Sequence, residues 1–349
     1  MSFIGIRCIT LIAILLIGFS SIAFGLLDLT QNANLFLYGC ILCHVLQTTG
    51  MALNAIGVDS MLVEYFPNNI SRMCGLFDLS CGVGLIFGAI IGSTLYFVTS
   101  YQFPFYLNGS LVLLTVPPCL LFIPKGDINL NCCVKYGKEK LTFKQLISIP
   151  EIFAIYISTF IAFQSHDFFQ PILGLHLTNL QVKDEMVGLF FALQSLGYTL
   201  NTLFICIVAT QTKNKLNFLF VGLWIQALAF IIIGCGSVID VFQNNLYIIA
   251  FMLFLNGCGL SLSYIPALDL IANILNNCDI SKNLSTSCIA SSVLSASTFL
   301  GETIGPLLGG LLFANFGFTQ ACALMAIFPL STVCFKQQHP INLNSFSSL

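Results

Sequence analysis

The sequence predicts an all-α protein that crosses a membrane about ten times, a fold class that rests on two observations. Only 7% of its 349 residues are charged and 57% are hydrophobic, whereas a soluble domain has about 25% charged residues. Apolar stretches of about 20 residues, enough to cross the hydrocarbon of a bilayer, recur along the whole chain with short polar breaks. The lipid bilayer is therefore the expected surroundings, and no sizeable soluble domain fits between the stretches.

Polar residues between the apolar stretches mark the boundaries of the predicted helices. The first helix follows Arg7 and has the look of a signal peptide. It is long, however, and it lacks a convincing small-residue cleavage site before Asp28, so we predict that it is retained. The helices are predicted at residues 8–27, 35–58, 73–97, 104–123, 150–176, 186–209, 216–238, 246–275, 286–314 and 319–335.

Lysine and arginine residues predict the orientation of these helices. If there are ten, all of the 12 basic residues except Lys183 fall on the same side of the membrane. Because loops rich in Lys and Arg stay in the cytoplasm, we expect the central loop and both termini to be cytoplasmic. The sequence does not distinguish a vesicle membrane from the plasma membrane.

An internal repeat predicts two parallel halves. The third helix carries Gly84, Gly88 and Gly92 at four-residue spacing, and the ninth carries Gly301, Gly305 and Gly309 with the same spacing, 217 residues later. Because the matching helices are six apart, the repeating unit has six helices, and by this measure two helices are absent at the N-terminus. The predicted parts are an incomplete four-helix half (1–124), a basic central loop (125–149), a complete six-helix half (150–335) and a cytoplasmic tail (336–349).

A basic loop between two parallel six-helix units, each with a glycine-rich fifth helix, resembles the major facilitator superfamily. More narrowly, residues 64–70, residues 82–92, Gln170-Pro171 and residues 284–310 resemble the vesicular amine transporter-like branch of proton-coupled antiporters. The resemblance covers nearly the whole chain. It implies a major facilitator fold with about ten transmembrane helices, four plus six, and alternating-access transport of a small organic solute, in this branch a cationic amine. It leaves open whether protons are coupled to that transport.

Several positions depart from the pattern of this branch. His44 stands where the family usually has an arginine, and Gln47 and Gln170 stand where the branch usually has aspartates. Ala89 replaces the proline of the first antiporter motif. These differences change the polar groups on which proton coupling in the branch depends.

Ionisable side chains near the middle of a helix are the candidates for a substrate or proton site. Each costs about 2.5 to 3.5 kcal/mol to insert, so those that remain tend to face a cavity. His44, Asp167 (beside His166) and Glu302 meet this condition, and Gln47 and Gln170 would lie beside them if the helices point these groups inward. Carboxylates and a histidine would suit a protonated amine and protons. The alternative is that these groups only form hydrogen bonds between helices.

Small residues and prolines predict the helix interfaces that alternating access requires. Glycines spaced by four residues let backbones approach closely, and a proline removes a helix donor. Pro266 is predicted to interrupt the eighth helix. The residues with a predicted role in gating or helix packing are Gly84, Gly88, Gly92, Gly301, Gly305, Pro306, Gly309, Gly310 and Pro266.

Other classes of protein are excluded on chemical grounds. Cys40-x-x-Cys43-His44 has the spacing of a haem attachment site, but it lies within a predicted membrane helix, so no cofactor and no metal are expected. No nucleophile elbow or phosphate loop is present, so an enzyme is not expected, and the net charge of -2 argues against nucleic acid. Two alternatives remain: a truncated, non-transporting membrane protein with a binding or regulatory role, and an incomplete gene model of a twelve-helix transporter.

Overall fold

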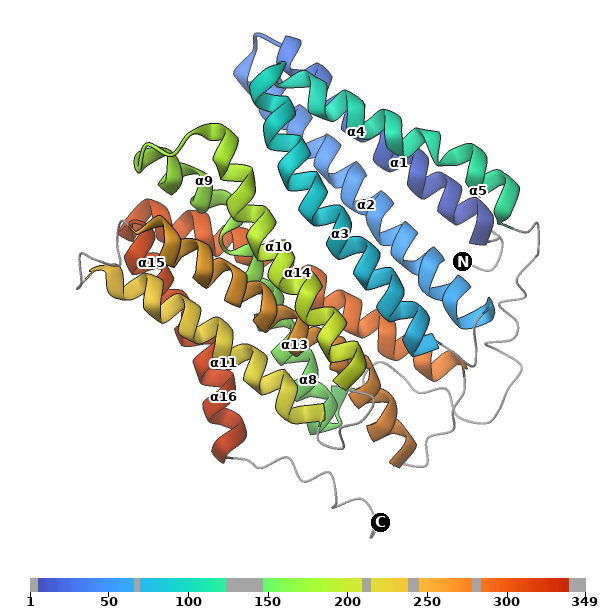
Figure 1. Ribbon diagram of the computed structural model, residues 1–349. Helices are drawn as coiled ribbons and strands as arrows, with labels where there is room; N and C mark the ends of the chain where they lie inside the picture. Colours follow the sequence, from blue (N-terminus) through green and yellow to red (C-terminus); the bar gives the residue numbers. More distant parts are fainter. Residues whose placement is uncertain are drawn as a thin grey trace. The chain divides into compact units, whose positions relative to one another are not determined.

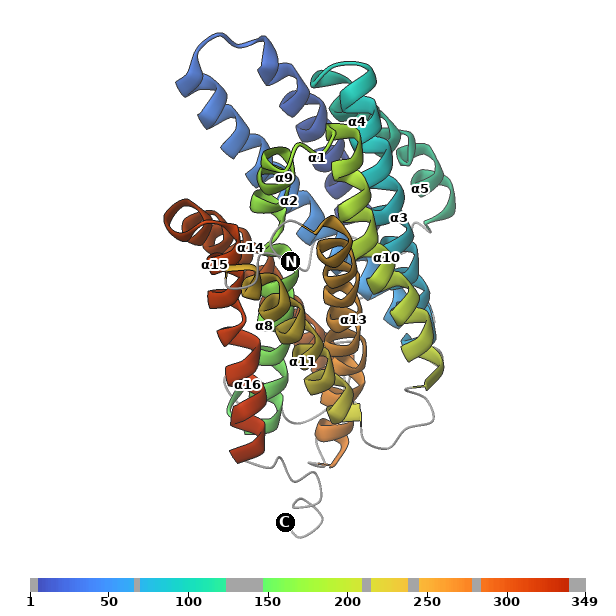
Figure 2. The same cartoon turned by 60° about the vertical axis from the view of Figure 1, so that its left-hand side comes forward.

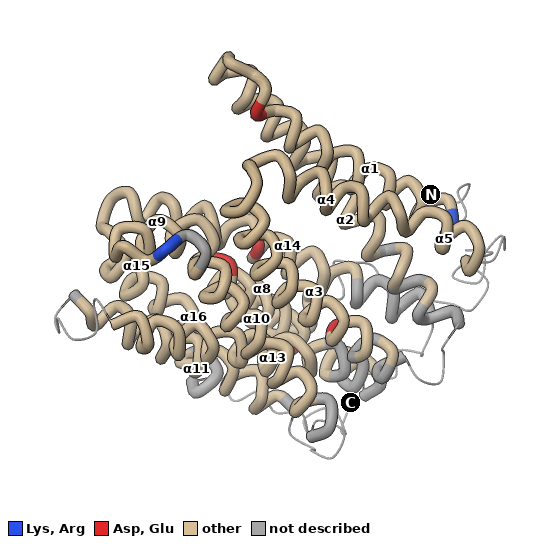
Figure 3. Tube along the Cα trace, turned by 45° about the horizontal axis from the view of Figure 1, so that its top comes forward, with Lys and Arg blue, Asp and Glu red and all other residues tan. Residues whose placement is uncertain are grey.

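The computed structural model describes residues 6–65, 70–123, 147–208, 215–237, 245–277 and 284–338, and these residues form helices and no strands (Figure 1). Most of the predicted central loop and tail lies outside them. Nine of the described helices or helix pairs are long and apolar enough to cross a membrane, and the shorter apolar segment Phe318–Cys334 makes a tenth. Charged residues are sparse along the described part of the chain (Figure 3).

The chain divides into two compact units, which we describe separately. The first comprises Met1–Met73 and Ile91–Gly137, and the second comprises Cys74–Ile90 and Lys138–Leu349. The boundary crosses α3, so that residues 74–90, the larger part of this helix, group with the C-terminal helices.

Within the first unit, α1 packs against α2 and α4. A glycine pair brings α1 and α4 together: a Cβ built at Gly109 would lie 2.8 Å from the carbonyl oxygen of Gly18. Ser21 Oγ donates to the carbonyl oxygen of Phe105 at 3.3 Å across the same contact. The helices of this unit are α1 (Ile6–Leu26), α2 (Ala33–Tyr65), the C-terminal part of α3 (Ile70–Val98), α4 (Gln102–Leu114) and α5 (Val116–Phe122), with the 3-10 turn η1 (Leu27–Leu29) after α1.

Within the second unit, α13 packs against both α10 and α11, and α8 packs against α14 (Figure 2). Gly317, with a φ of 77°, follows α14 and lets the chain turn into α15. The helices are α8 (Pro150–Asp167), α9 (Gln170–Asn179), α10 (Asp184–Val208), α11 (Lys215–Gly234), α13 (Leu246–Asn277), α14 (Leu284–Phe316), α15 (Phe318–Met325) and α16 (Ile327–Gln338), with the 3-10 turn η2 (Cys235–Ser237) after α11.

Three of the predicted spans are each divided into two helices. The divisions fall at Thr115, at Phe168-Phe169 and at Ala326, and each lies two or three residues before a proline. Each of these prolines lacks the N–H that would bond to the carbonyl oxygen four residues earlier in a continuing helix. The interruption expected at Pro266 does not occur, and α13 continues through this buried residue. The packing of α10 and α11 along α13 stabilises the continuous helix.

Aromatic side chains hold the division between α8 and α9 in place. Phe168 and Phe169 are fully buried and both contact Phe230 of α11, with ring centroids 5.5 Å and 4.9 Å apart. Phe169 also contacts Phe318 of α15. These contacts anchor the chain directly before Gln170 and Pro171.

Candidate functional site

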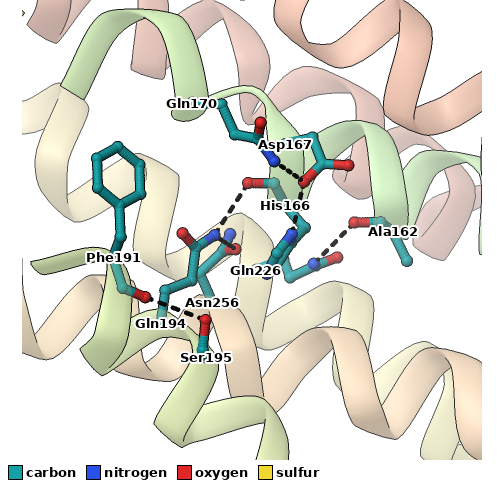
Figure 4. A network of polar contacts seen from close by, with 9 residues as sticks. All are labelled: Ala162, His166, Asp167, Gln170, Phe191, Gln194, Ser195, Gln226 and Asn256. Atoms are coloured by element: carbon teal, nitrogen blue, oxygen red, sulfur yellow. Dashed lines mark hydrogen bonds and ion pairs between the residues drawn. The ribbon is translucent and has the colours of Figure 1, made fainter. Parts of the chain in front are cut away.

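Three polar side chains meet where α8 ends and α9 begins. Asp167 is buried, with 5% of its surface exposed. Its Oδ1 atom lies 2.9 Å from Nδ1 of His166 and accepts a hydrogen bond from Nε2 of Gln170 at 2.8 Å (Figure 4). A histidine that donates from Nδ1 to a carboxylate keeps Nε2 as its hydrogen-bond acceptor.

A buried amide ties α10 to this region. Nε2 of Gln194 donates to the backbone oxygen of His166 at 2.9 Å and to Oδ1 of Asn256, on α13, at 3.1 Å (Figure 4). An amide nitrogen has two hydrogens, so both are in use. The remaining polar atom of Gln194 is Oε1, which can only accept a hydrogen bond.

A cavity of about 340 Å³ lies beside these groups, within the second unit. Asp167 itself does not line the cavity, but both of its hydrogen-bond partners do. One wall is the small-residue face of α3, and the opposite wall carries the polar groups of α8, α9 and α10. The lining residues are Gly84, Leu85, Gly88, Ala89, His166, Gln170, Phe191, Gln194 and Ser195.

Gly84 and Gly88 of α3 face open space, whereas Gly301, Gly305 and Gly309 of α14 meet a neighbouring backbone. A Cβ built at Gly84 or Gly88 would meet no atom within 4 Å. By contrast, a Cβ at Gly301 would lie 2.5 Å from the carbonyl oxygen of Phe160, and one at Gly305 would lie 2.6 Å from that of Gln164. A Cβ at Gly309 would collide with the carbonyl oxygen of Phe168 in the same way. The three glycines of α14 thus contact three successive turns of α8.

Glu302 follows the first of these α14 glycines. Its side chain is half-buried and lies within electrostatic reach of Asp167 and His166. Two carboxylates therefore belong to this region, one on α8 and one on α14. Pro306 is half-buried within α14, and Gly310 has open space at its Cβ position.

The remaining predicted residues lie elsewhere. His44 is exposed and Gln47 is half-buried on α2, in the first unit. Gly92 of α3 also belongs to the first unit and has no atom within 4 Å of its Cβ position. Pro266 is buried in α13.

The structure adds residues that sequence reasoning did not select. Gln194, Phe191 and Ser195 line the cavity, and Asn256 supports Gln194 from behind. The available signal was an amide in the middle of an apolar helix, which is costly unless hydrogen-bonded. In the described part of the chain, no group of three or more His, Cys, Asp or Glu side chains could hold a metal ion.

Known proteins resemble this chain along most of its length. The rat MFS-type transporter SLC18B1 is 26% identical over 329 residues, which cover 94% of this chain and 70% of the rat protein. The human protein of the same name is also 26% identical, over 90% of this chain and 67% of its own length. These relatives support the vesicular amine transporter-like branch that the sequence resembles. An uncharacterized transporter of Buchnera aphidicola is 23% identical over 81% of this chain and 69% of its own.

A solved structure and a family model identify the fold. The crystal structure of a bacterial homologue of the iron transporter ferroportin, in an outward-facing state, superposes with a TM-score of 0.64 at 14% identity, covering 99% of this chain and 84% of that one. The likeness shows a common fold. The model of the Major Facilitator Superfamily matches residues 2–131 and 155–341, and the chain therefore belongs to this superfamily of multi-pass membrane transporters, whose members carry small solutes across the bilayer.

Proposed function

We propose that this chain transports a small organic solute carrying a protonated amine, and that the amine binds in the cavity between α3 and the α8, α9 and α10 wall. The observation that carries the proposal is the set of hydrogen-bonding atoms left to the cavity. In His166, Gln170 and Gln194, the N–H groups described above donate to protein atoms. The atoms that remain for a ligand are acceptors, Nε2 of His166 and Oε1 of each glutamine, apart from the second N–H of Gln170.

An acceptor-rich wall favours a ligand that donates. A protonated amine carries up to three N–H donors and a positive charge, so it matches three acceptors beside a buried carboxylate. The carboxylate of Asp167 lies directly behind His166 and Gln170, and Glu302 adds a second negative charge in the same region. The apolar part of the solute would lie against Leu85 and Phe191.

The same groups allow exchange of the amine for protons. The lone pair of an imidazole nitrogen can bind either a proton or a hydrogen-bond donor. A proton on Nε2 of His166 would remove one acceptor and place a positive charge where the ammonium binds, so proton and amine would exclude each other. This mutual exclusion is the requirement for antiport, and it operates without the aspartates that Gln47 and Gln170 replace.

Alternating access would use the two kinds of glycine contact differently. α8 and α14 touch along three turns and would move as one body, while the open glycine face of α3 would slide past the solute. The proposed cytoplasmic position of both termini and of the central loop defines which side of the membrane each helix end faces.

Uptake by the reconstituted protein tests the proposal. Proteoliposomes with an imposed proton gradient are given labelled primary amines of different size, with uncharged isosteres as competitors. We expect saturable uptake that Asp167→Asn reduces by at least tenfold and that uncharged isosteres do not inhibit. Asp28→Asn is the matched control, because Asp28 is exposed and its carboxylate accepts from Gln102 outside this cavity.

The outcomes separate the alternatives. Uptake that is equal for Asp167→Asn and for the unchanged chain would refute the proposed site. Absence of uptake by monodisperse, thermally stable protein, combined with amine binding, would favour a binding or regulatory membrane protein that does not transport. Uptake without dependence on the proton gradient would remove proton exchange and leave the amine site.

A further inference from the structure

We propose that a buried water molecule is held between α8, α11 and α13 by Ser165, Gln226 and Asn256, directly behind the wall of the cavity. All three side chains have 0% of their surface exposed. Each has one polar atom without a partner: Oγ of Ser165, Oε1 of Gln226 and Nδ2 of Asn256. Buried polar groups in native proteins are nearly always paired with protein or with ordered water.

Backbone carbonyls fix the orientation of the amides. Gln226 contacts the carbonyl oxygen of Ala162 at 3.0 Å, and a carbonyl can only accept, so the contacting atom must be the NH₂ group. The free atom of Gln226 is therefore its oxygen. Gln194 likewise donates to the backbone oxygen of His166, so the atom of Asn256 that faces Gln194 is an oxygen and the free atom is its NH₂ group.

The three residues belong to neighbouring segments of the bundle. Ala162 and His166 are one turn apart on α8, and Ser165 lies in the same turn. Gln226 packs on Gly259 of α13, because a Cβ at Gly259 would lie 2.6 Å from its Cγ. Gly259 is three residues from Asn256 and so lies on the same face of α13. Figure 4 shows Gln226 and Asn256 in the same network of polar contacts as His166.

The mixture of donor and acceptor identifies the ligand as water. The NH₂ group of Asn256 would repel a cation, and the amide oxygen of Gln226 would repel an anion. Water can accept from Asn256 and donate to Gln226, with the Ser165 hydroxyl as a third partner, and buried waters typically make about three hydrogen bonds. The water would connect three helices on the inner side of α8.

This water would also orient the cavity wall, a consequence that rests on the proposed function. It holds the NH₂ group of Asn256, which leaves the oxygen of Asn256 turned to Gln194. Gln194 then keeps both of its N–H donors inside and presents its own oxygen to the cavity. Asn256 and Gln226 are thus positioning residues for an acceptor that they do not form themselves.

A structure of the full chain at a resolution that shows ordered waters gives the direct test. We expect a density peak within hydrogen-bond distance of Nδ2 of Asn256 and Oε1 of Gln226. The peak should be absent from the double variant Asn256→Leu with Gln226→Leu. An empty position, in a map that shows other buried waters, would overturn the proposal whether or not the protein transports amines.

Thermal unfolding of the purified chain gives a second, independent test. Each single variant, Asn256→Leu and Gln226→Leu, should lower the Tm by about 3 °C or more, because each leaves the water and the opposite amide poorly paired. The double variant should lose clearly less than the two losses together, since the groups share one ligand. Additive losses would show that the two amides are independent and would overturn the proposal. Ser263→Ala is the control, since its hydroxyl donates to the carbonyl of Leu219 elsewhere on α13.

Discussion

Replacing Gly305 with alanine tests whether the glycine face of α14 is required for packing against α8. The added methyl group would lie 2.6 Å from the carbonyl oxygen of Gln164 and 3.2 Å from its Cα and carbonyl carbon. Ordinary contacts of a Cβ begin at 3.4 Å, so the helices would have to separate by about 0.8 Å at this point, and overpacking of this kind costs about 1 to 3 kcal/mol. Neither side can yield by rotating a side chain, because the contacting atoms belong to the backbone of α8.

Thermal unfolding of the purified protein measures this cost. For a unit of roughly 200 residues, 1 kcal/mol corresponds to about 2 to 4 °C, so the overpacking should place the Tm of Gly305→Ala roughly 3 to 10 °C below that of an alanine variant without such a contact. The matched control is Gly88→Ala, which makes the same chemical change at a helix position with no atom within 4 Å of the new methyl group. Because alanine favours a helix over glycine by about 1 kcal/mol, this control should unfold at the same temperature or a higher one.

The comparison can refute the reasoning in either direction. A Tm of Gly305→Ala equal to that of Gly88→Ala would mean that α8 and α14 do not meet as closely as described. A large loss in Gly88→Ala would mean that the open face of α3 is packed against another part of the protein. Either result would remove the physical distinction between the two glycine motifs.

Three further outcomes can be checked on the same protein. Gly88→Leu should fill part of the cavity and reduce amine uptake in proteoliposomes by at least tenfold, while the Tm changes by less than about 2 °C. Unchanged uptake would exclude the α3 wall from the solute path. Phe168→Ala should lower the Tm by roughly 6 °C or more, because a fully buried ring that contacts Phe230 is lost at a cost of about 3 to 5 kcal/mol. A smaller effect would show that the division between α8 and α9 is held by other contacts. Gln170→Ala should raise KM for the amine about tenfold with little change in Tm, because it removes an exposed side chain that pairs with the buried carboxylate of Asp167. A falling KM would show that Gln170 competes with the solute for Asp167.

The positions of the helices could be predicted because apolar length is a local property of the sequence. The predicted span 216–238 corresponds to α11, Lys215–Gly234, and 246–275 corresponds to α13, Leu246–Asn277. The end of the second helix was harder to predict, since α2 continues from the expected residue 58 to Tyr65. Helical hydrogen bonds do not require apolar side chains, so a helix can extend beyond the apolar stretch that reveals it.

Divisions within spans depend on information that single residues do not carry. Pro171 marks a division, yet Pro266 and Pro306 lie inside continuous helices. A proline removes one hydrogen bond in each case, and the packing of neighbouring helices decides whether the rest of the helix persists. At Phe168-Phe169 the aromatic contacts to α11 and α15 stabilise the divided form.

The candidate site shows the same limit. Asp167 could be selected from the sequence because a carboxylate within hydrocarbon is costly wherever it lies. Gln194 and Asn256 could not, because a neutral amide has a function only through the atoms that it meets. The assignment of Gln194 as an acceptor required knowing that its N–H donors are used by His166 and Asn256, on two other helices.

The two copies of the internal repeat illustrate how identical spacing can serve different purposes. In α14 the glycines meet the backbone of α8, and in α3 the same spacing leaves Gly84 and Gly88 at a cavity wall. A glycine every four residues guarantees only that one face of a helix has no side chains. A neighbouring backbone that reaches this face makes it a close contact, and a face that no backbone reaches is left as open space. A substitution series along both helices therefore distinguishes the two uses better than the motif itself: alanine should cost stability in α14, whereas in α3 larger residues should cost transport and leave stability unchanged.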